Sequence, residues 1–274
     1  MSDWQPDLYL AFRKERTQPA IDLVAKIDYH APDRIIDIGS GPGTSTAVLK
    51  ARWPEAEIMG VDKSEAMIEQ AIALFPNMNW QYADASEDLS SLGGFDIVFS
   101  NAVIQWIPDN EALVHRLFGM LNPGGVLAVQ VPRVTDMPIY SCLMDLVSGE
   151  KWSETFAGFT EVYSRQPVEF YYDVLSPLTQ DLDMWETRYF HVMNTHADIV
   201  AWYSSTGLRN YLNYLGAGEK REEFLRDYEE LLTSAYEPQR DGKILFPYTR
   251  VFFIAKNSAI VQPAFTSEQT PGLA

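Results

Sequence analysis

Residues 34–43 read Arg34-Ile35-Ile36-Asp37-Ile38-Gly39-Ser40-Gly41-Pro42-Gly43 and decide the fold of this chain. The apolar start is typical of a buried strand, and three alternate glycines follow it as a turn. Because glycine has no Cβ, such a turn lets the backbone pass very close to a bound ligand. Hydroxyl residues from Thr44 onward are typical caps of a following helix. The stretch therefore predicts a strand–loop–helix unit for a nucleotide-like ligand at the start of an α/β domain.

The spacing of the glycines narrows the choice of ligand. Gly39 and Gly41 fit the first two positions of the dinucleotide fingerprint G-x-G-x-x-G, but its third position falls on Thr44. Pro42 also removes one backbone N–H donor that a pyrophosphate would use. The carboxylate of Asp37 suits a cationic or hydroxyl-bearing ligand better than an anion. We therefore expect S-adenosylmethionine, which carries a sulfonium and no phosphate, rather than NAD(P).

The composition limits the class of protein. The chain has 274 residues, of which 46% are hydrophobic, and this is ample for a sizeable core. The 21 basic and 38 acidic residues give a net charge of −17, which argues against nucleic acid or an anionic membrane as a partner. The single cysteine, Cys142, excludes an internal disulfide and a cysteine-cluster metal site. Without a signal peptide or a bilayer-spanning run, the sequence predicts a cytoplasmic protein with no bound metal.

Apolar runs alternate with amphipathic segments along the first half of the chain. Dense β-branched and aromatic residues in such runs are typical of parallel strands buried on both faces. An amphipathic helix is expected over residues 6–27, and further helices follow residues 44, 64 and 110. The expected strands span residues 34–38, 56–61, 78–83, 95–101 and 126–131. This alternation predicts a Rossmann-like α/β fold, a doubly wound sheet with right-handed crossovers.

The chain beyond Pro132 alternates more slowly. Helices are expected over residues 137–147, 167–175, 195–215 and 219–236, and strands over residues 184–193 and 244–255. The connection between these two strands is too long for an ordinary loop and predicts a helical cap over the site. The expected division is an N-terminal helical lid at 1–29, a main domain at 30–261 with cap insertions at about 133–180 and 194–243, and a disordered tail at 262–274.

Carboxylates follow successive predicted strands, at the edge where open parallel sheets bind ligands. Asp62 would accept both ribose hydroxyls, and Asp84 would accept the exocyclic amine of adenine. Aspartate at a strand end also commonly caps the next helix, so this second interpretation stays open for both residues. The predicted cofactor-binding residues are Asp37, Gly39, Gly41, Gly43, Asp62, Asp84 and Asn101.

As a set, these motifs resemble those of the class I S-adenosylmethionine-dependent methyltransferases. Residues 37–43 are similar to their first motif, and Val61-Asp62 to their ribose-binding strand end. Asn122-Pro123-Gly124-Gly125 is similar to the turn before their fifth strand. The resemblance covers residues from about 30 to 132 and implies a seven-stranded sheet whose last strand, here 244–255, is antiparallel.

A closer resemblance, to the trans-aconitate 2-methyltransferase family, runs along nearly the whole chain. It rests on residues 2–10, 15–16, 100–102, 105–106, 171–173 and 206–209. It implies an enzyme that forms a methyl ester on one carboxylate of trans-aconitate or a similar small polycarboxylate. A carboxylate with a pKa of about 4 is already ionised at pH 7. We therefore expect an enzyme that works by positioning its reactants, with no catalytic base. We also expect the enzyme to be a monomer.

A multiply anionic acceptor requires fixed cations in a chain of net charge −17. Arginine is best suited, because its planar fork grips a carboxylate bidentately. Arg250 is unusual in an apolar strand unless its charge is paired. An ordinary surface or salt-bridged arginine is the alternative at each position. The predicted substrate-binding residues are Arg16, Arg209, Arg250 and Tyr172.

Two other functions remain open from the sequence. A related methyltransferase could act on another acceptor, such as a malonyl thioester on an acyl carrier. Such a carrier is acidic and would require a basic face, which this composition hardly offers. A non-catalytic S-adenosylmethionine-binding module is the second alternative, but it would need no acceptor pocket.

Overall fold

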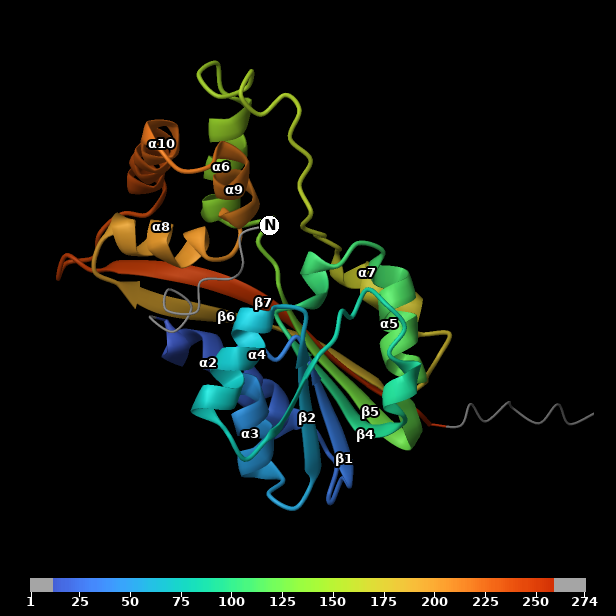
Figure 1. Cartoon of the computed structure of the whole chain (residues 1–274). Coiled ribbons are helices and arrows are strands. Elements are labelled where there is room, and N and C mark those ends of the chain that lie inside the picture. The colour runs from blue at the N-terminus through green and yellow to red at the C-terminus, as the bar shows by residue number, and fades with distance from the viewer. Residues whose placement is uncertain (1–11, 259–274) are drawn as a thin grey trace, which may run out of the picture.

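A seven-stranded sheet forms the centre of the protein, with its strands in the order β3-β2-β1-β4-β5-β7-β6 (Figure 1). The computed structural model describes residues 12–258. Strands β1 to β5 are parallel, and β7 is antiparallel to both β5 and β6. The strands are β1 Arg34–Ile38, β2 Glu57–Asp62, β3 Asn79–Tyr82, β4 Phe95–Asn101, β5 Leu121–Pro132, β6 Leu182–Met193 and β7 Ile244–Lys256. This topology confirms the predicted doubly wound sheet with an antiparallel last strand.

The α-helices of the described residues are α2 Arg13–Lys26, α3 Thr44–Arg52, α4 Glu65–Leu74, α5 Asn110–Gly119, α6 Pro138–Ser148, α7 Val168–Leu175, α8 His196–Ser204, α9 Arg209–Leu215 and α10 Glu219–Ala235. The single helix predicted over 195–215 is wrong, because residues 205–208 separate α8 from α9. A Cβ at Gly207 would lie 2.0 Å from the ring of Tyr203, so this break packs against that ring as only glycine allows. The part of the predicted N-terminal helix before residue 12 lies outside the described residues.

Helices cover both faces of the sheet, because alternate residues of each strand point to opposite sides. Ile35 and Phe99 pack with α2 and α3 in one cluster. Ile36 and Val98, one position away on the same strands, pack with α5 and α7 in another. The nearly continuous apolar sequence of β1 therefore follows from its burial on both faces.

Strands β6 and β7 continue beyond the end of β5. Strand β7 pairs with β5 only as far as Arg250, but it pairs with β6 as far as Ile244. Helices α6, α8, α9 and α10 gather around this extension and form a separate hydrophobic cluster with it (Figure 1). Most of the two predicted cap segments lies here, but α7, which is part of the predicted segment 133–180, packs with α5 on a face of the sheet. The division into lid, main domain and cap stays a prediction, and the predicted tail at 262–274 lies outside the described residues.

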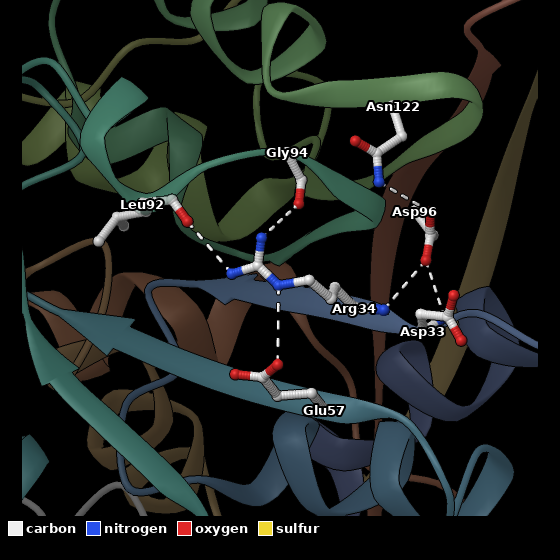
Figure 2. Close-up of polar contacts among 7 residues, drawn as sticks. All are labelled: Asp33, Arg34, Glu57, Leu92, Gly94, Asp96 and Asn122. Atoms are coloured by element: carbon white, nitrogen blue, oxygen red, sulfur yellow. Dashed lines mark hydrogen bonds and ion pairs between the residues drawn. The ribbon is translucent and has the colours of Figure 1, made fainter.

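Asp96 joins the amino ends of neighbouring strands on the opposite edge of the sheet (Figure 2). Its Oδ2 accepts the backbone N–H groups of Asp33 at 2.7 Å and Arg34 at 3.0 Å. Its Oδ1 accepts from Nδ2 of Asn122 at 2.9 Å. Burial acts to raise the pKa of Asp96, but the hydrogen bonds from Asn122, Arg34 and Asp33 hold it below its ordinary value.

The guanidinium of Arg34 completes this network. It donates to the carbonyl oxygens of Gly94 at 2.7 Å and Leu92 at 3.2 Å. Its Nε lies 3.7 Å from the carboxylate of Glu57 (Figure 2). The guanidinium also lies over the ring of Phe95, 4.6 Å from the ring centroid. Arg34 thus anchors β1 to β2 and to the turn before β4, far from the carboxyl ends of these strands.

Replacing Asp96 with alanine should lower the free energy of unfolding by about 2 kcal/mol, because the N–H groups of Asp33 and Arg34 lose their acceptor. Urea denaturation followed by circular dichroism measures the change. Glu57→Ala is the matched control, since it removes only an ion pair whose carboxylate side chain is 60% exposed. The control substitution should lower the free energy of unfolding by less than about 1 kcal/mol. Equal losses in both variants would contradict the role given to Asp96.

Candidate functional site

The glycine loop that follows β1 is hydrogen-bonded to the end of β2. The backbone N–H groups of Gly39 and Ser40 both donate to the carbonyl of Val61, at 2.8 and 2.9 Å. The N–H of Gly41 donates to Oδ2 of Asp62 at 2.9 Å. The loop leaves β1 where the strand order reverses between β1 and β4. Ligands of open α/β sheets bind at this position.

The loop glycines differ in the space around them, although Gly39, Gly41 and Gly43 all have positive φ, of 69°, 54° and 89°. A Cβ at Gly39 would lie 2.3 Å from Val103, and one at Gly43 would lie 2.5 Å from Trp80. A Cβ at Gly41 would meet nothing within 4 Å. The backbone at Gly41 therefore faces open space, as a loop that receives a ligand requires.

Asp37 is fully buried at β1 and holds the first turn of α3. Its Oδ2 accepts from the hydroxyls of Ser45 at 2.7 Å and Thr46 at 2.6 Å. Burial raises the pKa of Asp37 to about 7, although the two hydroxyls act to lower it. Its Oδ1 is buried without a hydrogen-bond partner among residues 12–258. Asp37 thus ties the loop to its helix, and its direct contact with a ligand stays a prediction.

The predicted residues Asp62 and Asn101, which end β2 and β4, and Asp84, which follows β3, lie at one edge of the sheet. Oδ1 of Asp62 accepts the N–H of Ser64 at 2.9 Å, so this carboxylate joins the glycine loop to the start of α4. Asp84 accepts from the N–H and the hydroxyl of Ser86, at 2.9 and 2.8 Å. Oδ1 of Asn101 is buried and has no hydrogen-bond partner in the described part of the chain. We call the glycine loop and these strand ends the carboxyl edge.

The backbone is strained directly after β4. Ala102 has a φ of 60°, which residues other than glycine rarely adopt. Its N–H donates to the carbonyl of Gln130 at 2.9 Å, and its carbonyl accepts from Nε2 of Gln105 at 2.7 Å. Oε1 of Gln105 is buried and unpaired within the described residues. Backbone strain beside unpaired buried polar atoms is typical of a functional site.

A buried pair of polar side chains lies next to this strand end. Arg250 of β7 donates from Nη1 to Oε1 of Gln130 at 3.1 Å, and both residues are buried. Gln130 lies opposite Asn101 in the register of β5 and β4. Its Nε2 has no acceptor among the described residues. Sequence reasoning missed Gln130, although a polar residue inside an apolar strand was the available signal.

Arg16 reaches the same region from α2. The residue is buried, and its Nη2 donates to the hydroxyl of Ser205 at 2.6 Å and to the carbonyl of Trp202 at 3.3 Å. Its guanidinium lies over the ring of Trp202, 5.0 Å from the centroid. Arg16 therefore joins the N-terminal helix to the helical cluster around β6 and β7.

The positive charges of three guanidinium groups act on the phenol of Tyr248. Burial raises the pKa of Tyr248, and the positive charges of Arg250, Arg16 and Arg165 act to lower it. Arg250 also lies over the Tyr248 ring, 4.9 Å from its centroid. We call Arg16, Arg165 and Arg250 the arginine cluster. Sequence reasoning missed Arg165, because nothing in its local sequence points to a pocket.

The loop that carries Arg165 links this cluster to the carboxyl edge. The N–H of Ser164 donates to the carbonyl of Gln105 at 2.7 Å. The ring of Tyr163 packs edge-on against Trp106, with 4.7 Å between centroids. Both partners follow β4 directly. The loop that carries Arg165 therefore packs against the segment that follows β4.

The other two predicted substrate residues lie in different surroundings. Arg209 is the partly exposed first residue of α9. Tyr172 is 55% exposed on α7, whereas its neighbour Tyr171 is buried and donates to Oδ1 of Asn110 at 3.1 Å. The contacts described above do not bring Arg209 or Tyr172 into the arginine cluster, and their roles stay predictions.

This geometry suits a cationic, nucleoside-like ligand at the carboxyl edge beside a polyanion at the arginine cluster. Within residues 12–258, no group of three or more His, Cys, Asp or Glu side chains is placed to hold a metal ion. In the same range, no helix combines the length and apolar character that crossing a bilayer requires.

Known proteins similar in sequence are methyltransferases. Residues 9–217 match the model of a methyltransferase domain. A trans-aconitate 2-methyltransferase of Methylobacterium radiotolerans is 40% identical over 264 residues, which cover 94% of this chain and 100% of that protein. The protein of the same name from Escherichia coli is 38% identical over 259 residues, or 93% of this chain and 99% of that one. These matches confirm both resemblances drawn from the motifs.

Solved structures with a similar fold are more distant in sequence. The YcgJ protein of Bacillus subtilis has a TM-score of 0.57 at 16% identity and covers 88% of this chain and 99% of its own. Phosphoethanolamine N-methyltransferase 2 of Haemonchus contortus, in complex with S-adenosyl-L-methionine, has a TM-score of 0.53 at 18% identity and covers 87% of this chain and 52% of its own. At such identities, the likeness supports the fold alone.

The raised pKa of Asp37 predicts a pH-dependent stability. Its ordinary value is 3.8 and its value in the folded protein is about 7, so between these values the folded state holds a proton that the unfolded state has lost. The free energy of unfolding should therefore fall as pH rises through this window, by up to about 1.4 kcal/mol per pH unit from this group. Asp37→Asn should flatten the fall, as urea denaturation between about pH 5 and 8 can measure. An unchanged slope would contradict this assignment.

Proposed function

This chain belongs to the trans-aconitate 2-methyltransferase family, and we propose that it transfers a methyl group from S-adenosylmethionine to one carboxylate of trans-aconitate. The products are the monomethyl ester and S-adenosylhomocysteine. The observation that supports this best is the arginine cluster, which places buried positive charge beside the carboxyl edge of a chain with net charge −17. A small polyanionic acceptor would supply the matching negative charge.

The carboxyl edge suits the donor. When bound, S-adenosylmethionine supplies a methyl group activated by a positively charged sulfur. The open space at Gly41 would accommodate it close to the backbone. The carboxylate of Asp62 would accept ribose hydroxyls, Asp84 the adenine amine, and the unpaired Oδ1 of Asn101 a further donor. Asp37 would keep the loop in shape through α3.

The arginine cluster would hold the carboxylates that do not react. Arg16 and Arg250 are buried, so solvent and salt would weaken their attraction for an anion only slightly. Held at two carboxylates, the acceptor would present the third toward the carboxyl edge. Arg209 and Tyr172 stay candidates for further hydrogen bonds to the acceptor.

The proposed reaction requires little acid–base catalysis by the protein. A carboxylate with a pKa of about 4 needs no general base at neutral pH. The residues of the site would align the carboxylate oxygen with the methyl group, and holding the two reactants in place supplies much of the rate. The packed rings of Tyr163 and Trp106 would help to exclude water between the two parts of the site.

The sequence also predicts that the enzyme is a monomer and that it works in the cytoplasm. Both statements stay predictions. Size-exclusion chromatography with light scattering tests the first, and a mass of two chains would contradict it.

Gly41→Ala should weaken binding of S-adenosylhomocysteine about tenfold or more while leaving the chain folded. Its φ of 54° costs alanine about 1 kcal/mol, but its Cβ meets nothing within 4 Å in the unliganded protein. Gly39→Ala is the contrasting variant, because its Cβ would lie 2.3 Å from Val103 and should destabilise the fold itself. Calorimetric titration and thermal denaturation separate the two effects. Unchanged affinity in Gly41→Ala would contradict the position of the donor.

The proposed reaction is tested by incubating the protein with S-adenosylmethionine and a panel of di- and tricarboxylates. Mass spectrometry should detect a base-labile monomethyl ester, most abundant with trans-aconitate. An acyl-carrier malonyl thioester belongs in the panel as the competing acceptor. Binding of S-adenosylhomocysteine without any ester from any acid would defeat the carboxyl methyltransferase proposal and favour a binding module.

A further inference from the structure

Arg165 lies in a loop between α6 and α7, outside any helix, with a side chain only 13% exposed. Its Nη1 and Nη2 each donate to one carboxylate oxygen of Glu161, both at 2.6 Å. The guanidinium also lies over the rings of Tyr140 and Tyr163, 4.4 and 4.6 Å from their centroids. A long, flexible side chain is thereby held in a single orientation.

The ion pair with Glu161 uses only some of the N–H donors of the Arg165 guanidinium. A guanidinium has five N–H donors in a fixed plane, and the pair with Glu161 uses two of them. Nε of Arg165 is buried and has no hydrogen-bond partner among residues 12–258. A buried donor without an acceptor is unfavourable and rare unless a ligand or water completes it. A second carboxylate could bind along the Nε side without displacing Glu161.

Glu161 is itself fixed, because it accepts a hydrogen bond from the hydroxyl of Tyr211 at 3.2 Å. A buried ion pair often contributes little to stability, because both charges lose their hydration. Such a pair is better explained as a device that orients the Arg165 fork before a ligand arrives. The three charges of the arginine cluster, less that of Glu161, also leave a net charge of +2.

A net charge of +2 matches two carboxylates rather than three. The third carboxylate of a tricarboxylate would face the sulfonium of the donor. After transfer, the ester and the thioether are both neutral, so two carboxylates remain opposite the cluster. The positive and negative charges of the arginine cluster with Glu161, the donor and the acceptor would thus cancel both before and after the reaction.

We propose that Arg165, oriented by Glu161, binds a carboxylate of the acceptor that is not methylated and so selects tricarboxylates over dicarboxylates. This inference rests on the function proposed above. The fixed loop contacts to the end of β4 place Arg165 close enough to the carboxyl edge to act on the same acceptor as Arg16 and Arg250.

The test compares Arg165→Gln with the parent enzyme on trans-aconitate and on trans-glutaconate, an analogue that lacks one carboxylate. The KM for trans-aconitate should rise about 10- to 100-fold, the range expected for lost hydrogen bonds between charged groups. The KM for trans-glutaconate should change far less, and affinity for S-adenosylhomocysteine should stay the same. If Arg165→Gln does not fold, Arg165→Lys keeps the charge but loses the fork and should still raise the KM for trans-aconitate.

Arg34→Lys is the matched control. The guanidinium of Arg34 also has a carboxylate neighbour, Glu57, at the amino ends of the strands (Figure 2). It also lies over an aromatic ring, that of Phe95. This variant should lose stability without changing the preference between the two acids. An Arg165 variant that raises both KM values equally, or neither, would overturn the inference.

Direct binding separates this inference from the proposed function. Tricarballylate and glutarate, a saturated tricarboxylate and dicarboxylate, are titrated calorimetrically into the protein saturated with S-adenosylhomocysteine. The parent should bind tricarballylate more tightly, and Arg165→Gln should lose that difference. A parent that methylates no acid but shows this difference would defeat the proposed function alone. Equal binding of both acids by the parent would overturn the role of Arg165.

Discussion

The position of Arg250 beside the ends of the parallel strands depends on the register of β7, which runs antiparallel to both of its neighbours. Arg250 pairs with Pro132 at the last position that β7 shares with β5, so its side chain reaches Gln130 at the level of the parallel strand ends. This register turns Arg250 to the face that α2 covers, where Arg16 lies. A shift of one residue would turn Arg250 to the opposite face and separate the two arginines.

The site stores unfavourable interactions that the rest of the fold has to compensate. Three guanidinium groups are held near one phenol, and Ala102 keeps a positive φ at the end of β4. Aromatic rings under the guanidinium groups and carbonyl oxygens beside them recover part of the lost hydration. The two large hydrophobic clusters on the faces of the sheet, and the third around β6 and β7, supply the remaining stability.

Local patterns were enough to predict the carboxyl edge. The bounds of β1 and β4 agree with the structure, and α4 follows residue 64 as expected. Ser64 caps this helix. Such elements are predictable because periodicity, glycine and capping residues act over a few positions. The acceptor site depends on contacts between distant segments. Arg165 and Gln130 meet the other polar groups only through the register of β7 and a loop outside any helix. The break between α8 and α9 was missed for the same reason, since the Tyr203 ring that requires Gly207 is a matter of packing.

The arginine cluster is buried within a chain of net charge −17, so the proposed anionic acceptor would meet repulsion before it meets attraction. At long range, the acidic surface repels a trianion, and dissolved ions screen this repulsion beyond about 8 Å at physiological ionic strength. At the buried arginine cluster, dissolved ions would hardly come between the guanidinium groups and the carboxylates of the proposed acceptor. Added salt would thus raise the association rate of the acceptor without weakening its contacts with the guanidinium groups. Proteins that bind anions on an exposed basic surface behave in the opposite way. In those proteins, salt weakens both the long-range attraction of the anion and its binding.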